Sequence, residues 1–451
     1  MSCCLKKKIR QKDCCLNSSA TVGSDNSLTP LTSELAKLEF FNQTNIIMDR
    51  KILITGTGIV SSLGNDTFSV EQKLAYGVCG LHHDPARSEK GYQSDLCGKI
   101  KDPNPWKLSE LTRAQRQCIS EPTLYSISAV NEALAEANIL PEFLQSHNVS
   151  VIVSNDSTAG ESYQAMTTAI TQRDTRRLGA TAVFRTLNST VSMNLASIYG
   201  LKGLSLTVSG ACAGGGHAIT LAKMLLDTRQ TEMVIVVGAQ EACPFSMLSF
   251  DGMGVFSPDK VQPFGKGRNG LAPSGGAACV ILEPSDSLRF EDYEVSPVAE
   301  LSGCGFSTNG TNICTPDAYQ EEVAMINAIE SAGLDAGMID VLLAHATGTE
   351  QGDAAEAEAI GKVFPESPYI VATKGMTGHE CWMAGVSQAV QAAMMLNTDT
   401  LFGAATTSEN AFPKLNLVMQ SREYSAHHIL CNAFGFGGTN SSFIISKYIP
   451  S

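Results

Sequence analysis

The sequence predicts an α/β fold in which buried strands alternate with helices. Continuous, β-branched apolar runs occur at 149–153, 204–208, 233–237 and 277–282, and such runs are typical of strands that are covered on both faces. Between the runs, apolar residues recur with helical spacing, most clearly at 124–137. Regular alternation of these two patterns indicates layered α/β architecture.

The chain begins with a segment unlike the rest. Residues 1–48 are rich in Ser, Thr, Asn and Lys and show no sustained apolar period, so we expect a disordered N-terminal extension. Ordered pattern starts directly after Met48, with a short apolar run at 51–56 that ends in glycine and reads as the first buried strand. Met48 is therefore a candidate true start, and residues 1–47 are predicted to be dispensable.

The second half repeats the scheme of the first and suggests an internal duplication. We divide the folded part into an N-terminal half at 49–290 and a C-terminal half at 291–451. The further helices and strands that the pattern predicts are helices at 217–226, 320–332, 354–363 and 386–396, and strands at 295–301, 341–345, 369–373, 429–433 and 442–446.

Composition narrows the classes of function. The chain of 451 residues is 43% hydrophobic and 17% charged, an ordinary composition for a soluble protein with a sizeable core. Its formal net charge of −13 disfavours nucleic acid as a partner, since phosphate binding needs a basic face. No apolar run approaches the roughly 20 residues of a membrane-spanning helix.

Cysteine usage indicates a reducing compartment. The 14 cysteines show no regular spacing after the first 15 residues, and the N-terminus lacks the apolar stretch of a secretory signal, so we expect a cytoplasmic protein with reduced thiols. Cys3, Cys4, Cys14 and Cys15 are conceivable zinc ligands, but adjacent pairs lack the usual spacing and no histidine lies within the first 80 residues. We expect neither a metal nor a cofactor.

Cys212 is the candidate nucleophile. It lies between the run at 204–208 and the helical pattern at 217–226, and its neighbours on both sides are Gly210, Ala211, Ala213 and Gly214. A thiol at such a strand-to-helix turn stands clear of the sheet, near backbone N–H groups, and the helix N-terminus favours its thiolate. The alternative interpretation is a small core cysteine that only packs.

Two histidines have similar glycine-containing surroundings. His345 ends the predicted strand at 341–345, and His379 follows Gly378 and precedes a helix. Taken singly, each could be tied to a backbone carbonyl. Taken together, two neutral imidazoles can donate N–H groups to one thioester oxygen and so stabilise an enolate. A thiol and two imidazoles are the groups required for acyl transfer through a covalent thioester.

Charged residues accompany both histidines. Asp353 and Glu356 open the predicted helix after His345, and Lys374 is close in sequence to His379. A lysine between carboxylates usually forms a structural ion pair, and it also influences the protonation of neighbouring histidines.

Four motifs together resemble the β-ketoacyl-[acyl-carrier-protein] synthases, which are condensing enzymes of the thiolase-like superfamily. The resemblance covers about residues 50–447 and is strongest to the branch with a Cys-His-His triad. In chain order the motifs are Ser209-Gly210-Ala211-Cys212-Ala213-Gly214, Ala344-His345-Ala346-Thr347-Gly348-Thr349, Lys374-Gly375-Met376-Thr377-Gly378-His379 and Asn432-Ala433-Phe434-Gly435-Phe436-Gly437-Gly438. The resemblance implies a duplicated, five-layered α-β-α-β-α fold.

The resemblance also implies roles for single residues. Cys212 would accept the acyl group, while His345 and His379 would assist decarboxylation. The oxyanion hole would be formed by the backbone N–H groups of Cys212 and Phe436, and the Phe436 side chain would gate the acyl pocket. Lys374 with Glu356 would form a supporting charge pair, and Asp353 would help to hold the loop.

On this interpretation the chain lengthens an acyl group by two carbons, using malonyl groups carried by acyl carrier protein, in fatty acid or polyketide synthesis. The resemblance implies a homodimer, with a heterodimer as the alternative, and a local basic patch that docks the acidic carrier protein.

The sequence departs from the family pattern at a few positions. Ala346 stands where glycine is usual, and Trp382 also replaces a usual glycine. Such a large side chain three residues after His379 either fills core space or crowds the acyl channel.

Other functions remain possible from the sequence. A polyketide or pigment-pathway synthase of the same fold is one alternative, which the altered region around Trp382 favours. A non-catalytic partner, such as a chain-length factor, would typically lack the nucleophile. A degradative thiolase would use a second cysteine near the C-terminus, where Cys431 lies. A cysteine protease would leave the second histidine unexplained.

Overall fold

A computed structural model describes residues 50–101, 110–241, 247–287, 289–292 and 295–449. Residues 50–451 form one compact unit. The predicted N-terminal extension and its four cysteines lie outside the described residues. Among the described helices, none is long and apolar enough to cross a membrane.

One mixed sheet of 11 strands runs through the unit, in the order β12-β10-β9-β14-β15-β8-β1-β7-β6-β4-β5. Two small two-stranded sheets, β2 with β3 and β11 with β13, lie apart from it. The strands are β1 (Ile52–Val60), β2 (Leu81–His83), β3 (Leu96–Gly98), β4 (Val149–Ser154), β5 (Ser205–Val208), β6 (Met233–Gln240), β7 (Gly276–Pro284), β8 (Ala299–Thr308), β9 (Val341–Leu343), β10 (Tyr369–Val371), β11 (Thr400–Leu401), β12 (Asn416–Leu417), β13 (Arg422–Glu423), β14 (His428–Gly435) and β15 (Thr439–Ser446).

The sheet contains the same five-stranded arrangement twice. The order β1-β7-β6-β4-β5 corresponds to β8-β15-β14-β9-β10. In both sets the first two pairings are antiparallel and the last two are parallel. A short ladder between β1 and β8, at Leu53 with Glu300 and Ile54 with Ala299, joins the two sets. The predicted duplication is therefore present in the strand topology.

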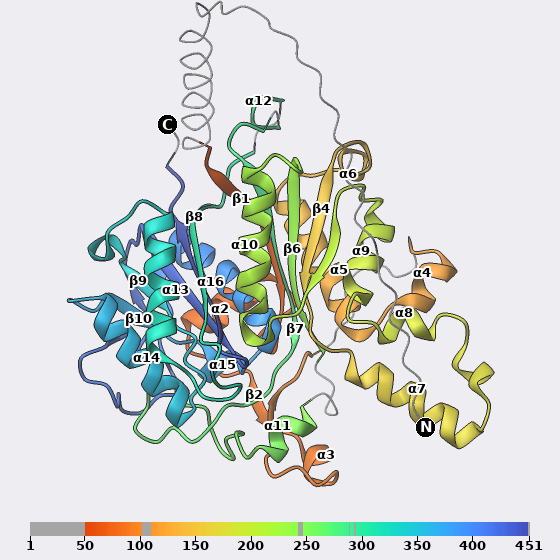
Figure 1. The fold of residues 1–451 in the computed structure, drawn as a ribbon, viewed down its shortest axis with the longest axis horizontal. Helices are drawn as coiled ribbons and strands as arrows, with labels where there is room; N and C mark the ends of the chain where they lie inside the picture. The colour runs from red at the N-terminus through yellow and green to blue at the C-terminus, as the bar shows by residue number, and fades with distance from the viewer. Residues whose placement is uncertain (1–49, 102–109, 242–246, 288, 293–294, 450–451) are drawn as a thin grey trace, which may run out of the picture. The chain divides into compact units, whose positions relative to one another are not determined.

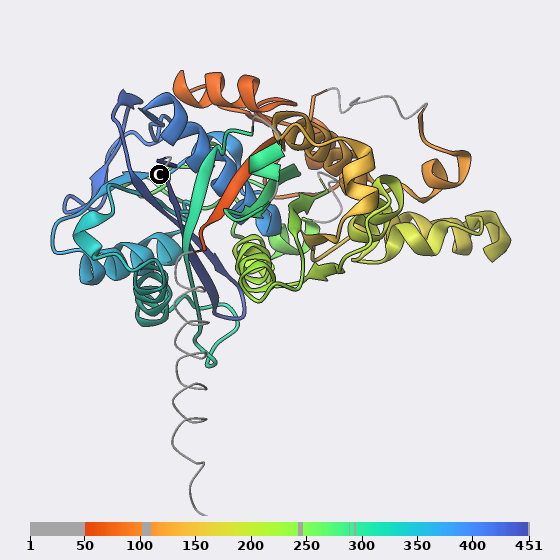
Figure 2. The same ribbon diagram turned by 90° about the horizontal axis from the view of Figure 1, so that it is seen from above.

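Helices complete five layers. The central helices α10 (Gly214–Asp227) and α16 (Ala384–Thr398) pack on each other and on strands of both sets. Helices α5 (Glu121–Glu136) and α9 (Thr190–Tyr199) cover the outer face of the first set, and α13 (Ala318–Ser331) covers that of the second beside α14 (Glu350–Val363). Figures 1 and 2 show α10 and α16 enclosed between the strands. The predicted α-β-α-β-α architecture is confirmed.

Glycines allow the two central helices to touch. A Cβ atom on Gly215 of α10 would lie only 2.8 Å from the backbone nitrogen of Val386 on α16, and one on Gly385 would lie 2.4 Å from the nitrogen of Gly216. Larger residues at these positions would push the helices apart. The close contact brings together the short turns that precede the two helices.

The remaining helices are shorter or lie at the periphery. Several were not predicted, and most of these are too short to show an apolar period. They are α2 (Thr67–Ala75), α3 (Pro85–Ser88), α4 (Arg113–Cys118), α6 (Pro141–Ser146), α7 (Ala159–Gln172), α8 (Ala182–Thr186), α11 (Leu248–Gly252), α12 (Arg289–Asp292), α15 (Lys374–Thr377) and the 3₁₀ turns η2 (Thr175–Leu178), η3 (Ala211–Ala213), η4 (Ala336–Met338) and η5 (Cys381–Met383).

Some sequence expectations were wrong. The strand expected at 295–301 begins at Ala299 and continues to Thr308, with Pro297 in the segment before it. The strand expected at 341–345 ends at Leu343, so His345 lies in the following loop. The run at 204–208 was expected to be buried on both faces, but β5 is the edge strand and is half exposed. An apolar run alone does not reveal a position at the sheet edge.

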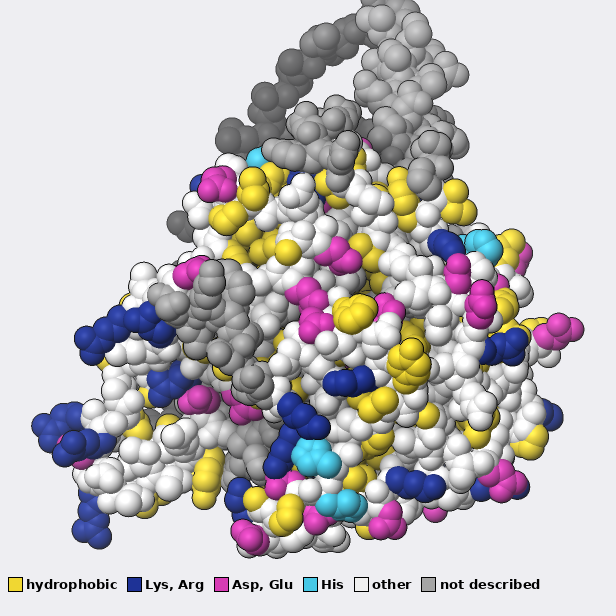
Figure 3. All heavy atoms as spheres, turned by 180° about the vertical axis from the view of Figure 1, so that it is seen from behind, with side chains coloured by type: hydrophobic (Ala, Val, Ile, Leu, Met, Phe, Trp, Pro, Cys, Tyr) yellow, Lys and Arg dark blue, Asp and Glu magenta, His cyan; other side chains and the backbone are white. Residues whose placement is uncertain are grey.

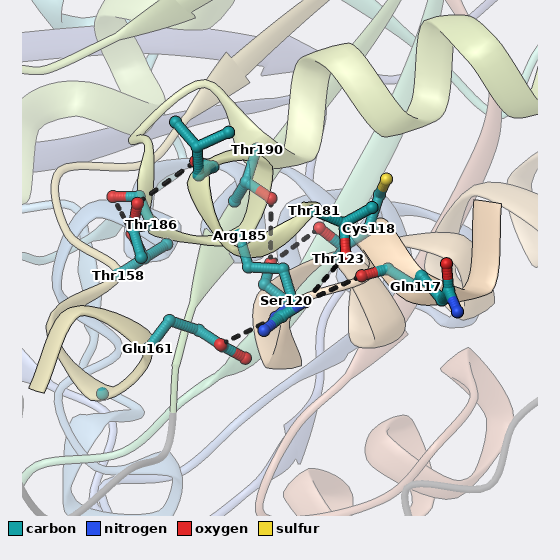
Figure 4. A network of polar contacts seen from close by, with 12 residues as sticks. Gln117, Cys118, Ser120, Thr123, Thr158, Glu161, Thr181, Arg185, Thr186 and Thr190 are labelled. Carbon is teal, nitrogen blue, oxygen red and sulfur yellow. Dashed lines mark hydrogen bonds and ion pairs between the residues drawn. The ribbon is translucent and has the colours of Figure 1, made fainter. Parts of the chain in front are cut away.

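Helix α7 projects from the unit with no buried residue and forms a lobe with η2 and α8 (Figure 1). Arg185 of α8 also links these elements to α4. Its guanidinium donates to a carboxylate oxygen of Glu161 at 3.0 Å and to the carbonyl of Gln117 at 2.8 Å, as Figure 4 shows. We call α4, α7, η2 and α8 the projecting lobe.

Candidate active site

Cys212 lies on η3, at a sharp turn between β5 and α10. The preceding residue, Ala211, has a φ of +47°, which is uncommon for any residue other than glycine. The carboxylate of Asp156 accepts hydrogen bonds from the N–H groups of Gly210 and Ala211 at 3.1 and 2.8 Å. These two bonds hold the strained turn that presents the thiol.

His379 lies directly beside this thiol. Its Nε2 atom is 3.2 Å from Sγ of Cys212. The backbone of His379 is held from both sides, because its N–H donates to the carbonyl of Ala272 at 2.7 Å and its carbonyl accepts from the N–H of Ser274 at 3.1 Å. The imidazole therefore approaches the sulfur from a fixed backbone.

His345 follows β9 and lies next to His379. The two ring centroids are 5.4 Å apart and the rings are nearly perpendicular. The carboxylate of Glu356 accepts the N–H groups of His345 and Ala346 at 2.8 and 2.7 Å, and it also accepts from the amide of Asn432 at 3.1 Å. Ala346 has a φ of +29°, so this bend needs such support in the absence of glycine.

The predicted supporting charges are buried around the histidines. Asp353 accepts the N–H groups of Phe264 at 2.7 Å and Gly348 at 3.0 Å, and so fixes the loop after His345. Lys374 and Glu356 are both buried and attract each other electrostatically. They make no direct ion pair, so the expected pairing of these two residues acts at longer range.

Burial and charge shift several protonation equilibria in the site. The neighbouring Cys381 thiol, followed by His379 and Lys374, lowers the pKa of Cys212 well below its usual range. Burial, reinforced by the Lys374 charge, lowers the pKa of His345 well below 6.5. His345 is therefore a neutral imidazole at neutral pH that can donate one N–H, and the surroundings of Cys212 favour its thiolate form.

A cavity of about 510 Å³ opens onto these groups. Its wall includes Cys212, His345 and His379 together with Phe250, Phe434 and Phe436. The rings of Phe436 and Phe250 stack with centroids 5.9 Å apart, so Phe436 lies at the cavity, where a gate was predicted. Backbone atoms of Gly435 approach the backbone nitrogen of Cys212 closely, since a Cβ on Gly435 would be 3.1 Å from it.

The structure also reveals residues that sequence reasoning missed. Asp156 and the Ala272–Ser274 backbone support the thiol and His379, but nothing in their sequence neighbourhood marks them. Cys381 and Glu380 directly follow His379 in the chain, and both side chains are buried.

Two other predicted candidates lie away from the cavity wall. Cys431 is fully buried on β14 and does not line the cavity. Trp382 is buried in an apolar cluster with Met247, Phe256, Leu271 and Cys381, and it does not line the cavity either. Within the described residues, no cluster of three or more His, Cys, Asp or Glu side chains has the arrangement of a metal site.

A duplicated five-layered fold with a thiol and two histidines at one cavity defines the class of thiolase-like condensing proteins. Family comparison narrows this further. The sequence matches the beta-ketoacyl synthase N-terminal domain over residues 49–287 and the C-terminal domain over residues 298–406. The chain belongs to the beta-ketoacyl synthase family.

Individual relatives agree with this assignment. The chain is 30% identical over 416 residues to 3-oxoacyl-[acyl-carrier-protein] synthase 1 of Buchnera aphidicola subsp. Acyrthosiphon pisum, which covers 88% of this chain and all of the relative. A beta-ketoacyl synthase from Burkholderia phymatum superposes with a TM-score of 0.83 at 25% identity, over 89% of this chain and 100% of that one. The ishigamide ketosynthase/chain length factor shares the fold, with a TM-score of 0.82 at 22% identity over 89% of this chain and 100% of that one.

Proposed function

We propose that this protein is an active 3-oxoacyl-[acyl-carrier-protein] synthase that extends a cysteine-bound acyl chain by two carbons, in fatty acid or polyketide synthesis. The contact of 3.2 Å between His379 Nε2 and Cys212 Sγ, at a cavity that His345 also lines, carries this proposal. The name of the Buchnera relative supports the reaction and the carrier.

The first half-reaction transfers the acyl group. The Cys212 thiolate attacks the carbonyl carbon of an acyl thioester on acyl carrier protein, and the carrier thiolate leaves. The oxygen that becomes negative in the tetrahedral intermediate faces the backbone N–H groups of Cys212 and Phe436, which would act as the oxyanion hole. Phe436, stacked on Phe250, would have to move aside to admit the chain.

The second half-reaction forms the carbon–carbon bond. A malonyl thioester places its carbonyl oxygen between His345 and His379, whose N–H groups stabilise the enolate as the C–C bond to the carboxylate breaks and CO₂ leaves. The enolate carbon attacks the Cys212 thioester, and the cysteine sulfur leaves as the thiolate. A neutral His345 imidazole suits this role because it donates a hydrogen bond and takes no proton from the substrate.

The main alternative is a non-catalytic partner that resembles a chain-length factor. Such a partner needs the fold but has no need of a supported thiol. Here the turn at Ala211 is strained, and Asp156 stabilises it with two hydrogen bonds. Retaining strain to present a thiol favours catalysis.

The projecting lobe offers a docking surface for an acidic carrier protein. Figure 3 shows Lys and Arg side chains gathered at this projecting end. Its exposed cations are Arg113 and Arg116 on α4 and Arg173, Arg176 and Arg177 at the end of α7 and on η2. Such a local basic surface explains how a chain with a net charge of −13 attracts an anionic partner.

A second copy of the chain is a further proposed partner. It would bind at an apolar, open edge of the main sheet. Strand β5 has a neighbour on one side only, and Leu204 and Leu206 are 45% and 39% exposed. Tyr163, Met166 and Ile170 add an exposed apolar stripe on α7. An unpaired edge strand with exposed leucines is a template for pairing with another chain, which supports a homodimer.

The proposed reaction is tested with Cys212→Ala and the matched control Cys431→Ala, another buried cysteine. Incubation with acyl carrier protein thioesters should give an acyl-enzyme mass for the wild type and Cys431→Ala and none for Cys212→Ala. Cys212→Ala should still release CO₂ from malonyl carrier protein, because decarboxylation uses the histidines. Condensation by Cys212→Ala at the wild-type rate would refute the assignment, and loss of condensation in Cys431→Ala would favour a thiolase-like use of two cysteines.

His345→Ala separates the two half-reactions. It should acylate Cys212 nearly normally and lose about 10²–10³ in the condensation rate, the usual loss for one donor to a developing oxyanion. His379→Ala should lose condensation similarly and should also slow acylation, because His379 contacts the sulfur. Wild-type condensation by both variants would exclude the decarboxylation role.

A further inference from the structure

A buried carboxyl group in the cavity wall has no part in the proposed mechanism. Glu321 lies in the first turn of α13 and is 2% exposed. It lines the same cavity as Cys212 and His345. Its Oε2 atom has no hydrogen-bond partner among the described residues. A buried polar atom without a partner lowers the stability of the folded state, so its place at a cavity points to a ligand that supplies the missing partner.

The other buried carboxyl groups near His345 have partners that explain their burial. Glu356 accepts hydrogen bonds from two backbone N–H groups and from the side-chain amide of Asn432. Asp353 accepts hydrogen bonds from two backbone N–H groups. Both therefore hold the loop after β9 in place. Oε2 of Glu321 holds no backbone group, so support of the fold does not account for it.

The inner face of α13 connects Glu321 to the histidine loop. Met325 lies one turn after Glu321 on the same face of the helix. The side-chain nitrogen of Asn432 donates to the sulfur of Met325 at 3.4 Å and to Glu356 at 3.1 Å. Glu321 therefore lies beside the polar network that supports His345, on the face of α13 that turns toward the cavity.

Glu321 is uncharged at neutral pH. Burial, followed by the negative charges of Glu356 and Asp317, raises the pKa of Glu321 to about 9. A protonated carboxyl group carries one O–H donor. The ligand that completes it must therefore present an acceptor, and a neutral oxygen such as a carbonyl suits a donor that bears no charge.

The carrier of the substrate supplies such acceptors. The cavity extends from Cys212 to exposed residues such as Ile313, which is 73% exposed. Because acyl carrier protein is itself a macromolecule, only the narrow arm that bears its thioester can enter this cavity. That arm is a phosphopantetheine, which contains two amide groups, so amide carbonyl oxygens pass along the cavity wall whenever the thioester reaches Cys212.

We propose that the carboxylic acid of Glu321 donates an O–H hydrogen bond to an amide carbonyl oxygen of the carrier's pantetheine arm, and that this bond sets how far the arm enters the cavity. Glu321 is then a substrate-binding residue that positions the thioester for attack by Cys212. The inference rests on the proposed function in taking acyl carrier protein as the carrier of the substrate.

The test compares two iodoacetamides of equal length. One carries a pantetheine-like chain with two amide groups, and the other carries an alkyl chain without amides. Both alkylate Cys212, since the S–C bond forms as iodide leaves, and peptide mass identifies the modified residue. Glu321→Met removes the donor and should slow alkylation by the amide reagent about tenfold, the effect of losing one hydrogen bond. Its rate with the alkyl reagent should equal that of the wild type.

Two matched variants control for the substitution itself. Glu321→Gln keeps an N–H donor at this place and should retain most of the wild-type rate with the amide reagent. Glu350→Met removes an exposed carboxylate from the same cavity wall and should leave both rates unchanged.

Melting curves add a second measurement. Glu321→Met should be at least as stable as the wild type, because methionine removes a buried oxygen that has no partner. A less stable variant would show that the carboxyl group is bonded within the folded protein, and it would overturn the proposal.

Two alkylation results would also overturn it. One is a wild-type rate with the amide reagent in Glu321→Met, and the other is equal slowing with both reagents, which would assign Glu321 to the support of Cys212. Alkylation requires no condensation. If the variants behave as expected but the wild type never condenses, the proposed function is disproved and binding of the arm by Glu321 still stands.

Discussion

Substitution of Trp382 tests whether this side chain fills core space or lines the acyl channel. Its side chain is 6% exposed and packs with Met247, Phe256, Leu271 and Cys381. Because it does not line the cavity, we expect Trp382 to fill core space and to have no direct contact with the acyl chain. The indole Nε1 has no hydrogen-bond partner among the described residues, so packing is its main contribution.

The cost of truncation follows from this burial. A buried tryptophan removes about 150–250 Å² from water, which corresponds to roughly 4–6 kcal/mol at about 25 cal/mol/Å². Trp-to-Ala changes in protein cores typically cost about 3–5 kcal/mol. We therefore expect Trp382→Ala to lose about 3–5 kcal/mol of unfolding free energy, and Trp382→Phe to recover most of it, since phenylalanine keeps an aromatic ring and sacrifices no hydrogen bond.

The assay pairs urea unfolding with the product chain lengths that each variant makes from a panel of acyl carrier proteins. The expected result is a destabilised Trp382→Ala enzyme with an unchanged chain-length profile. Leu271 belongs both to the tryptophan cluster and to the cavity wall, so the competing outcome is a change in chain length transmitted through Leu271. A stable Trp382→Ala enzyme that accepts longer chains would refute the core-filling argument and make Trp382 part of the acyl channel.

Three further predictions concern pH, docking and the N-terminus. Burial raises the pKa of Glu380 from 4.5 to about 7, so the folded state retains a proton that the unfolded state releases. The free energy of unfolding should therefore fall by up to about 3 kcal/mol as the pH rises from about 4.5 to about 7, and it should stay constant above that pH. In urea unfolding at pH 5 and pH 8, Glu380→Gln should no longer show this fall in unfolding free energy. A variant that loses as much free energy between the two pH values as the wild type would contradict the prediction. Arg176→Glu with Arg177→Glu should lower kcat/KM for carrier-bound substrates at low salt and spare small thioester substrates, whereas equal losses for both would argue against docking there. A chain that starts at Met48 should condense and dimerise like the full chain, and loss of either property would give residues 1–47 a function.

The sequence by itself determined the layered fold and the main reacting groups. Its strand and helix patterns recur in two halves, and the two sets of five strands have the same order and directions. Cys212, His345 and His379 could be recognised as candidates from the sequence because each has glycine and other small residues as near neighbours in the chain. These features depend on nearby residues, which a linear pattern can report.

The tertiary structure decided how these groups are supported. Asp156 and Ala272 act on Cys212 and His379 from distant parts of the chain, and the exposed edge position of β5 depends on which strands pair. The turns η3 and η5 meet because helices α10 and α16 touch through glycines. Long-range contacts of this kind leave no periodic signal, since each partner is selected by its surroundings in the folded state and not by its neighbours in the chain.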